Sequence, residues 1–268
     1  MSRYAASMDA GGSVSFERAA DVYDRTRLTD PVALAAALDV LDGVLPAGRV
    51  LEIGVGTGAI AVPLAERGRR VVGLDVSTAM LERLRAKDGS GRVAAAVADA
   101  TRLPVADGAF VGAYCRWVLH LIAAWRDAVR ELCRAVAPGG VIVVEPAGYT
   151  GEWREVWLRF VELLGPAAEP VGVDARGGYV DLDEAFATSG AHRREVIRTS
   201  MRIDSSLERF LDEAAARAYS WTWRVGDDEL ARAVDAVRAW AVDRFGPDLT
   251  QPFSPDAPQS WRVYDLRT

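Results

Sequence analysis

A glycine-rich turn carries the strongest chemical signal in the sequence. The apolar run Val50–Ile53 is followed by Gly54, Gly56 and Gly58 at alternate positions. Glycines at this spacing let the backbone pass close to a ligand, because the missing Cβ atoms remove a steric barrier. The turn does not identify the ligand by itself, since Gly54, Gly56 and Ala59 also satisfy the pattern of dinucleotide-binding turns.

Three carboxylates accompany this turn. Glu52 comes immediately before the glycines, while Asp75 and Asp99 each follow a further apolar run. If the three runs are neighbouring parallel strands, one acid stands at the carboxyl end of each strand. Carboxylates in this arrangement can accept hydrogen bonds from several hydroxyl or amino groups of one ligand.

The elements that must position these residues alternate between strand and helix. A helix begins at Pro31 after the capping residue Asp30 and ends at Gly43, and the segment before it is predicted to be frayed over residues 2–13 and helical from about Phe16. The predicted strands cover residues 49–53, 70–74, 92–98, 109–115 and 141–145, and the helices between them cover residues 57–67, 77–87 and 125–137. This alternation predicts an open α/β sheet with right-handed crossovers.

After Pro146 the regular alternation of strands and helices ends. Helices are predicted at residues 152–164, 182–188, 206–219 and 227–245, and a polar strand at 193–203. Residues 246–260 contain four prolines and predict an irregular loop. The last eight residues alternate as a closing strand does.

A family resemblance emerges from these motifs together. Several motifs resemble those of class I S-adenosylmethionine-dependent methyltransferases, close to the small-molecule enzymes of ubiquinone and menaquinone biosynthesis. They are the glycine turn with Glu52 before it, Asp75 in VVGLDVS, Asp99 in VADATRLPVADGAF and the segment LCRAVAPGGVIVV. The resemblance covers residues 16–145. It implies one domain, residues 1–268, with a Rossmann-like open sheet of seven mostly parallel strands and helices on both faces. Residues 14–145 would bind the donor, and insertions after the fifth and sixth strands, residues 146–192 and 204–260, would form a helical cap.

The resemblance also implies roles for particular residues. The glycine turn and Glu52 would hold the methionine portion of S-adenosylmethionine, and Asp75 would bind the ribose hydroxyls. The adenine would lie against Val76, Asp99 and the backbone of Ala100, while the methionine end would meet Arg116, Trp117, Tyr23 and Arg27. For Tyr23 and Arg27 an exposed helix face is the alternative.

The reaction implied by the resemblance is methyl transfer to a small acceptor by in-line displacement at sulfur, with S-adenosylhomocysteine released. His120, which follows the fourth strand, could remove a proton from the acceptor. Alignment of the reactants can instead supply much of the rate without a base. Trp153, Trp157 and Trp221 could line an acceptor pocket, or they could form the core of the cap.

Composition narrows the class of partner. The chain has 268 residues, 32 basic against 38 acidic side chains and a net charge of −6, which disfavours a nucleic-acid binder. Its two cysteines and its lack of a carboxylate or histidine cluster with ligand spacing predict no metal site. With no long apolar run and no apolar signal segment at its start, the chain is expected to be cytoplasmic and away from membranes. We also expect it to act as a monomer or homodimer.

The motifs are also compatible with two other functions. The fold could bind S-adenosylmethionine and serve a non-methylating or non-catalytic role, because donor-binding motifs report binding only. A nicotinamide-dependent dehydrogenase would use the glycine turn and Asp75, but it would leave Glu52 and Asp99 without a role.

Overall fold

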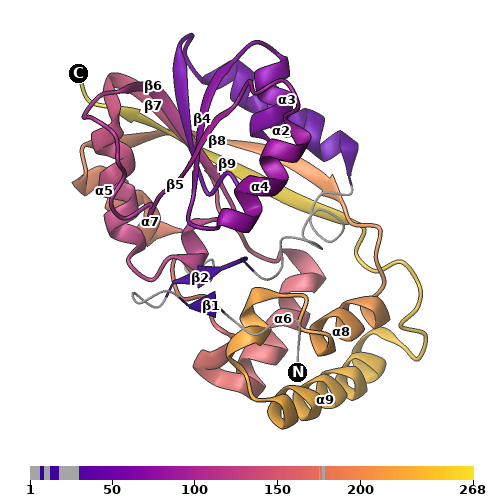
Figure 1. Ribbon diagram of the computed structural model, residues 1–268. Helices are drawn as coiled ribbons and strands as arrows, with labels where there is room; N and C mark the ends of the chain where they lie inside the picture. The colour runs from indigo at the N-terminus through magenta and orange to yellow at the C-terminus, as the bar shows by residue number, and fades with distance from the viewer. Residues whose placement is uncertain (1–6, 9–12, 18–29, 175, 177–178) are drawn as a thin grey trace. The chain divides into compact units, whose positions relative to one another are not determined.

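The computed structural model describes residues 7–8, 13–17, 30–174, 176 and 179–268 (Figure 1). The described chain forms two compact units. We call residues 7–147, 171–199 and 259–268 the sheet unit, and residues 148–170 and 200–258 the helical unit.

A seven-stranded sheet with the order β5-β4-β3-β6-β7-β9-β8 organises the sheet unit. The strands are β3 (Arg49–Ile53), β4 (Arg70–Asp75), β5 (Ala94–Val97), β6 (Phe110–Arg116), β7 (Val136–Glu145), β8 (Ala191–Arg202) and β9 (Asp256–Leu266). Strands β3 to β7 pair in parallel, and β9 pairs antiparallel with β7. The chain runs outward from β3 to β5 and then returns to β6 beside β3, so the strand order reverses between β3 and β6. Ligands of open α/β sheets bind at such a switch point.

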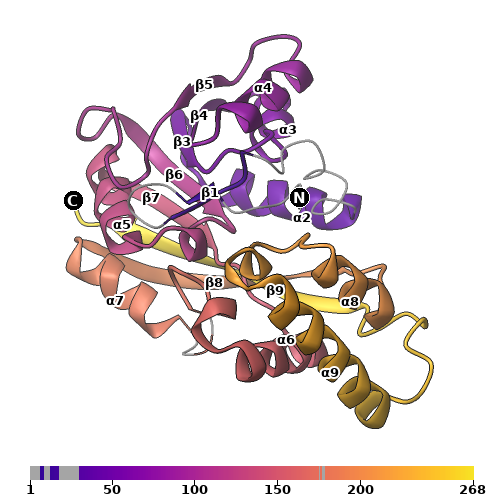
Figure 2. The same ribbon diagram turned by 60° about the horizontal axis from the view of Figure 1, so that its bottom comes forward.

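Helices cover both faces of this sheet, which confirms the predicted fold class. One apolar layer joins the sheet to α5 (Trp125–Ala135) and α7 (Val180–Thr188), and the other joins it to α2 (Pro31–Val44), α3 (Ala61–Glu66) and α4 (Thr78–Lys87). Figure 2 shows α2, α3 and α4 grouped apart from α5 and α7. Alternation along β3 divides its side chains between the layers, with Leu51 and Ile53 in the first and Val50 in the second.

Local capping sets the start of two helices, each within one residue of the start that the sequence predicts. The Asp30 carboxylate accepts the N–H of Val32 at 2.8 Å, and Pro31 opens α2. The Ser77 hydroxyl accepts the N–H of Met80 at 3.1 Å and so caps α4. Both contacts satisfy backbone donors that have no partner within the helix.

Several predicted boundaries were wrong. Helix α3 begins at Ala61 rather than at residue 57, because the preceding glycines adopt left-handed conformations that a helix cannot use. Strand β7 begins at Val136, and β9 already begins at Asp256 inside the predicted loop. The frayed start was also wrong for the described residues, since β1 (Ser7–Met8) pairs antiparallel with β2 (Val14–Ser15). The helix predicted from about Phe16 falls mainly on residues 18–29, which lie outside the described residues.

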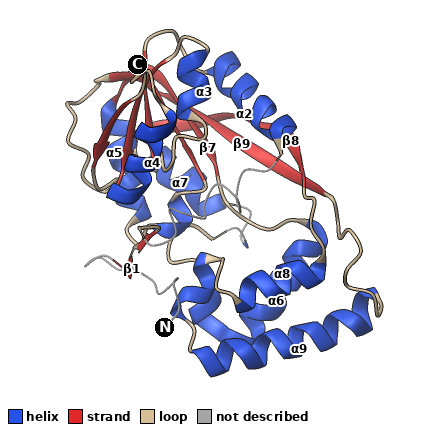
Figure 3. Ribbon diagram, turned by 45° about the vertical axis from the view of Figure 1, so that its right-hand side comes forward, coloured by secondary structure: helices blue, strands red, loops and turns tan. Residues whose placement is uncertain are grey.

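The helical unit has a core of its own. It contains α6 (Gly151–Leu164), α8 (Leu207–Ala215) and α9 (Asp227–Phe245), which Figure 3 labels. Short 3-10 helices at Gly165–Ala168 and Ser220–Arg224 belong to the same unit. Helix α9 packs against both α6 and α8 and has the predicted bounds. The predicted helix 206–219 stops at Ala215, and Arg217 beyond it has a left-handed backbone with φ of 60°.

The predicted division into donor core and cap segments stays a prediction. Helix α7 falls within the predicted cap segment 146–192, and it packs against α5 in the sheet unit. Among the described residues, no helix is long and apolar enough to span a membrane.

Candidate functional site

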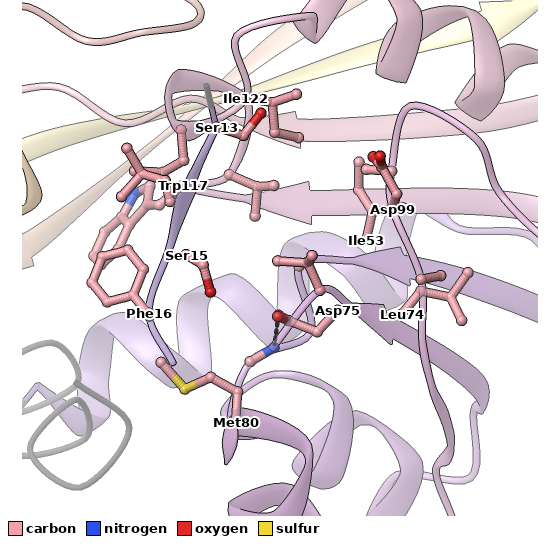
Figure 4. A pocket seen from close by; sticks show the side chains of 18 of the residues that line it. Ser13, Ser15, Phe16, Ile53, Leu74, Asp75, Met80, Asp99, Trp117 and Ile122 are labelled. Atoms are coloured by element: carbon pink, nitrogen blue, oxygen red, sulfur yellow. Dashed lines mark hydrogen bonds between the residues drawn. The ribbon is translucent and has the colours of Figure 1, made fainter. Parts of the chain in front are cut away.

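A pocket of the sheet unit opens where β3, β4 and β6 end (Figure 4). Its wall includes Ile53, Gly54 and Gly56 from the glycine turn, Leu74, Asp75, Val76 and Met80 around the end of β4, and Ala98, Asp99 and Ala100 after β5. Arg116, Trp117, Val118, Leu121 and Ile122 contribute from the end of β6, and Ser13, Val14, Ser15 and Phe16 from the N-terminal part. The pocket therefore lies at the point where the strand order reverses, and it gathers most of the predicted donor residues.

The glycine turn is shaped by close packing and by its backbone conformation. Gly54 has φ of +65°, and a Cβ atom added there would lie 2.2 Å from Cγ2 of Val118. Gly58 has φ of +76°, and a Cβ atom there would lie 2.9 Å from side-chain atoms of Leu84 and Val62. Glycine is therefore needed at both positions. At Gly54 it lets the turn pack against Val118, and at Gly58 it lets the turn pack against α3 and α4.

Asp75 joins the end of β4 to this turn. Its Oδ2 accepts the N–H of Gly56 at 2.8 Å, and its Oδ1 accepts the N–H of Ser77 at 2.9 Å. Burial raises the pKa of Asp75 above its usual value, while the hydrogen bonds from Ser77 and Gly56 oppose that shift. A carboxylate has about four acceptor positions, so Asp75 can accept hydrogen bonds from a ligand in the pocket as well as from the backbone. This arrangement fits the two neighbouring hydroxyls of a ribose.

Asp99 and Val76 form the part of the wall nearest β5. Oδ1 of Asp99 accepts the backbone N–H and the hydroxyl of Thr101, both at 2.8 Å. These contacts fix the carboxylate after β5, and Figure 4 shows it on the opposite side of the view from Trp117, with Asp75 between them. Val76 is 46% exposed although it is apolar, so it offers a surface that a flat apolar group could cover.

Glu52 is placed differently from the other predicted acids. It is 3% exposed, it is absent from the wall that the described residues form, and it accepts the hydroxyl of Tyr114 at 2.8 Å. Burial raises the pKa of Glu52 to about 8, and the nearby charge of Asp75 acts in the same direction. The carboxyl group is therefore mostly neutral at pH 7, and its contact with a ligand stays a prediction.

The end of β6 holds a buried ion pair and an aromatic ring. Arg116 Nε donates to Oε2 of Glu145 at 2.5 Å, and these side chains are only 6% and 2% exposed. The guanidinium carbon lies 3.9 Å from the centre of the Trp117 ring, and the Trp117 N–H donates to the Glu145 carbonyl at 2.9 Å. Burial raises the pKa of Glu145, and the charge of Arg116 opposes that shift.

Comparison with known proteins identifies the family. A family profile described as a methyltransferase domain matches residues 51–144. An uncharacterized methyltransferase of Mycobacterium tuberculosis is 30% identical over 213 residues, which cover 78% of this chain and 79% of that protein. The chain belongs to the S-adenosylmethionine-dependent methyltransferases. A demethylmenaquinone methyltransferase of Renibacterium salmoninarum is 32% identical over 149 residues, 54% of this chain and 61% of that protein.

Solved structures share the fold of this methyltransferase. An S-adenosylmethionine-dependent methyltransferase of Thermotoga maritima superposes with a TM-score of 0.57 at 18% identity, over 94% of this chain and 98% of that one. The cyclase SpnF superposes with a TM-score of 0.56 at 20% identity, over 87% and 81% of the two chains. These structures support the predicted architecture, and family membership favours the methyltransferase over the dehydrogenase interpretation.

The N-terminal part of the methyltransferase contributes a wall, residues 13–16, whose members the sequence did not single out, although residues 14–145 were predicted to bind the donor. The Ser13 hydroxyl accepts the N–H of Ala123 at 3.2 Å, and the Glu17 carboxylate accepts the Ser77 hydroxyl at 2.5 Å and the Ala79 N–H at 3.2 Å. Residues 13–17 are thus tied to the chain after β6 and to the start of α4. The short alternation Ser-Val-Ser was the one signal available, and it is too brief to identify a strand. Met80, Leu121 and Ile122 were also missed as lining residues.

Tyr23 and Arg27 lie outside the described residues. Gly58 and His120 are described, but neither lines the pocket formed by the described residues. His120 lies in the 3-10 turn Leu119–Leu121, where its carbonyl accepts the N–H of Gly172 at 3.0 Å. Its predicted role as a base stays a prediction.

The three tryptophans predicted to meet the acceptor lie in the core of the helical unit. Trp153, Trp157 and Trp221 are 3%, 7% and 9% exposed, respectively. The Trp153 ring centre lies 5.3 Å from that of Phe210, and its indole N–H donates to the Ser254 carbonyl at 2.9 Å. This burial agrees with the alternative that they form the core of the cap, and contact with an acceptor stays a prediction.

Proposed function

We propose that this methyltransferase binds S-adenosylmethionine in the pocket at the ends of β3, β4 and β6 and methylates a small-molecule acceptor. The observation that carries the proposal is the Asp75 carboxylate, whose two oxygens accept the backbone N–H groups of Gly56 and Ser77 and stand on the pocket wall at the end of β4. A ribose diol matches such a pair because it presents two neighbouring hydroxyl donors.

The other lining residues would each hold a part of the donor. Val76 and Ala100 offer an apolar surface for the adenine, and Asp99 offers an acceptor for its amino group. The glycine turn leaves room for the methionine portion beside Trp117. When bound, the donor supplies an electrophilic methyl group that is transferred by in-line displacement at sulfur, and S-adenosylhomocysteine is the product.

The residues of the chain would accelerate methyl transfer mainly by binding the donor and the acceptor and orienting them toward each other. Holding two reactants in a productive geometry can supply about 7 to 11 kcal/mol of rate acceleration. A base at His120 is therefore not required by the proposal.

A small acceptor is supported by charge and by the relatives. The net charge of −6 gives no basic footprint for a nucleic acid. The demethylmenaquinone methyltransferases among the relatives are named for a small acceptor. We extend this to a role in secondary metabolism, with the chain acting as a monomer or homodimer.

Thermal unfolding with three ligands tests the donor site. S-Adenosylmethionine, S-adenosylhomocysteine and NAD would be compared at equal concentrations on the wild type, on Asp75→Ala and on Asp39→Ala, a control on the exposed surface of α2. A ligand at 100 times its dissociation constant should add about 2.7 kcal/mol of stability. We expect both sulfur ligands to stabilise the wild type and the control, and Asp75→Ala to lose most of this effect. Stabilisation by NAD alone would overturn the donor assignment.

Turnover separates methyl transfer from other uses of the same pocket. Formation of S-adenosylhomocysteine would be followed with a panel of phenols, amines, thiols and carbon acids. Release of this product only when an acceptor is present supports methyl transfer. A tightly bound donor without turnover on any acceptor would favour a non-methylating role, since the same fold serves the cyclase SpnF.

A further inference from the structure

Trp117 has a backbone conformation that is energetically unfavourable for a bulky side chain. Its φ is +54°, in the left-handed region where the Cβ atom of a bulky residue crowds the backbone. Glycine or asparagine would adopt this conformation at lower cost. Strain of this kind persists where surrounding contacts enforce it, and it is concentrated at ligand sites. Trp117 lines the pocket, so its conformation directs a large aromatic ring to a ligand site.

Its neighbours hold the ring in place. The Trp117 N–H donates to the Glu145 carbonyl at 2.9 Å, and the Arg116 guanidinium lies against the ring at 3.9 Å from its centre. Arg116 is paired with the buried Glu145 carboxylate at 2.5 Å, so the positive charge beside the ring is balanced. The ring is therefore positioned before any ligand arrives, and the site is electrically close to neutral on this side.

The sheet order indicates which part of the donor reaches Trp117. This step rests on the proposed function, in which the ribose binds at Asp75 and the adenine lies toward β5. Strand β3 stands between β4 and β6, so the ends of β4 and β6 are two strand spacings apart, or about 10 Å. The rest of the donor must then extend over the glycine turn toward β6, which brings its sulfonium to the side of the pocket that contains Trp117.

That side of the pocket offers a cation few partners. Among the described lining residues, the carboxylates are Asp75 and Asp99, and both belong to the β4 and β5 side. The neighbours of Trp117 on the wall include the apolar Val118, Leu121 and Ile122. An aromatic face attracts a cation through the negative charge above its ring, and this attraction strengthens where water is excluded.

We propose that the indole ring of Trp117 recognises the sulfonium charge of S-adenosylmethionine and so favours the donor over the neutral product. S-Adenosylhomocysteine shares the adenine, ribose and amino-acid groups of the donor but lacks the positive sulfur. Trp117 is then a specificity-determining residue that lowers the relative affinity for the product. Glu145 supports this role, because an unpaired Arg116 would repel the same cation.

Calorimetric titration of the full chain tests the proposal without an acceptor. The ligands are S-adenosylmethionine, S-adenosylhomocysteine and sinefungin, an analogue that carries an ammonium group in place of the methylated sulfur. We expect Trp117→Leu to weaken S-adenosylmethionine and sinefungin by about 3- to 30-fold. Binding of S-adenosylhomocysteine should change by less than about twofold, because a neutral thioether gains nothing from the ring charge. Trp117→Phe, which keeps an aromatic face, should retain most of the preference for the charged ligands.

Each other outcome has a definite meaning. Equal weakening of all three ligands by Trp117→Leu, or no weakening of any, would overturn the recognition of charge. Asp75→Ala is the matched comparison, since it should weaken all three ligands alike through their common ribose. If the wild type binds none of them, the proposed function fails as well. If it binds them and loses them together in Asp75→Ala, the donor site stands whatever Trp117→Leu does.

Discussion

Replacement of Glu52 by glutamine should change how the stability of the methyltransferase depends on pH. Glu52 is 3% exposed and accepts a hydrogen bond from Tyr114 at 2.8 Å. Burial raises its pKa to about 8, whereas a glutamate in the unfolded chain titrates near 4.5. Between these values the folded chain binds a proton at Glu52 that the unfolded chain has released. Unfolding then releases a proton, so the free energy of unfolding falls as pH rises through this window.

The size of the effect follows from these two pKa values. Each pH unit in the middle of the window costs about 1.4 kcal/mol, and the slope flattens near pH 4.5 and again near pH 8. Integration between pH 5 and pH 8 gives a loss of about 3 to 4 kcal/mol from Glu52. Glutamine has nearly the same shape and can still accept the Tyr114 hydroxyl, but it has no proton to lose. Glu52→Gln should therefore exceed the stability of the wild type by about 1 kcal/mol at pH 5 and by about 4 kcal/mol at pH 8.

Urea unfolding at pH 5, 6, 7 and 8 measures this difference directly. Asp75 and Glu145 also have raised pKa values and contribute in the same direction to the wild type, but they are unchanged in the variant, so the difference isolates Glu52. Glu66→Gln removes a carboxylate from the exposed end of α3 and controls for net charge. If the wild type and Glu52→Gln gave parallel stability curves over this range, the argument that Glu52 is buried and neutral would be refuted.

The same variant separates two interpretations of Glu52. The family resemblance assigns it to the methionine portion of the donor, whereas the structure buries it away from the described pocket wall. We expect Glu52→Gln to bind S-adenosylmethionine with unchanged affinity. A large loss of affinity with intact folding would restore the assignment made from the resemblance.

Three further substitutions probe the pocket wall and the helical unit. Glu17→Ala removes the carboxylate that ties residues 13–16 of the pocket wall to α4. Calorimetry should show the affinity for S-adenosylmethionine reduced by up to about tenfold. Unchanged affinity would contradict a role for these residues in binding. Gly54→Ala should lower the free energy of unfolding by about 2 to 4 kcal/mol, because the added Cβ atom clashes with Val118 and the backbone has a left-handed φ. Gly68 has φ of +93° and open space around it, so Gly68→Ala should lose only the stability that the backbone conformation costs. Equal losses of unfolding free energy in the two variants, measured in urea, would refute the clash. Trp153→Leu should cost about 2 to 4 kcal/mol without affecting donor affinity, and unchanged stability would contradict its place in the core of the helical unit.

Signals confined to neighbouring residues predicted much of the fold. The caps at Asp30 and Ser77 act over two or three residues, so the sequence alone locates the starts of α2 and α4. The bounds of α9 were predicted for a similar reason, since Gly226 and Gly246 flank a long helical pattern. The carboxyl-end positions of Asp75 and Asp99 follow from strand alternation and need no long-range information.

Features that depend on distant contacts could not be predicted in this way. Glu17 reaches Ser77 across 60 positions, so no local pattern shows that the neighbouring residues 13–16 form part of the pocket wall. Gly54 and Glu52 lie two residues apart, yet one lines the pocket and the other is buried against Tyr114. The contact between Glu52 and Tyr114 depends on β6 lying beside β3, and the sequence does not state this strand order.

The buried pair at the ends of β6 and β7 links stability to specificity. Removing either Arg116 or Glu145 leaves the other charge buried without its partner, and the cost of that unpaired charge exceeds what the pair itself contributes. The loss of stability in a single substitution at either position would therefore mainly measure the cost of the unpaired charge that remains. Replacing both with apolar side chains removes this cost, while the backbone contact from Trp117 to the Glu145 carbonyl can persist. If the ring itself carries the preference for the charged donor, that preference should survive the double replacement, because the pair keeps the site neutral and does not supply the attraction.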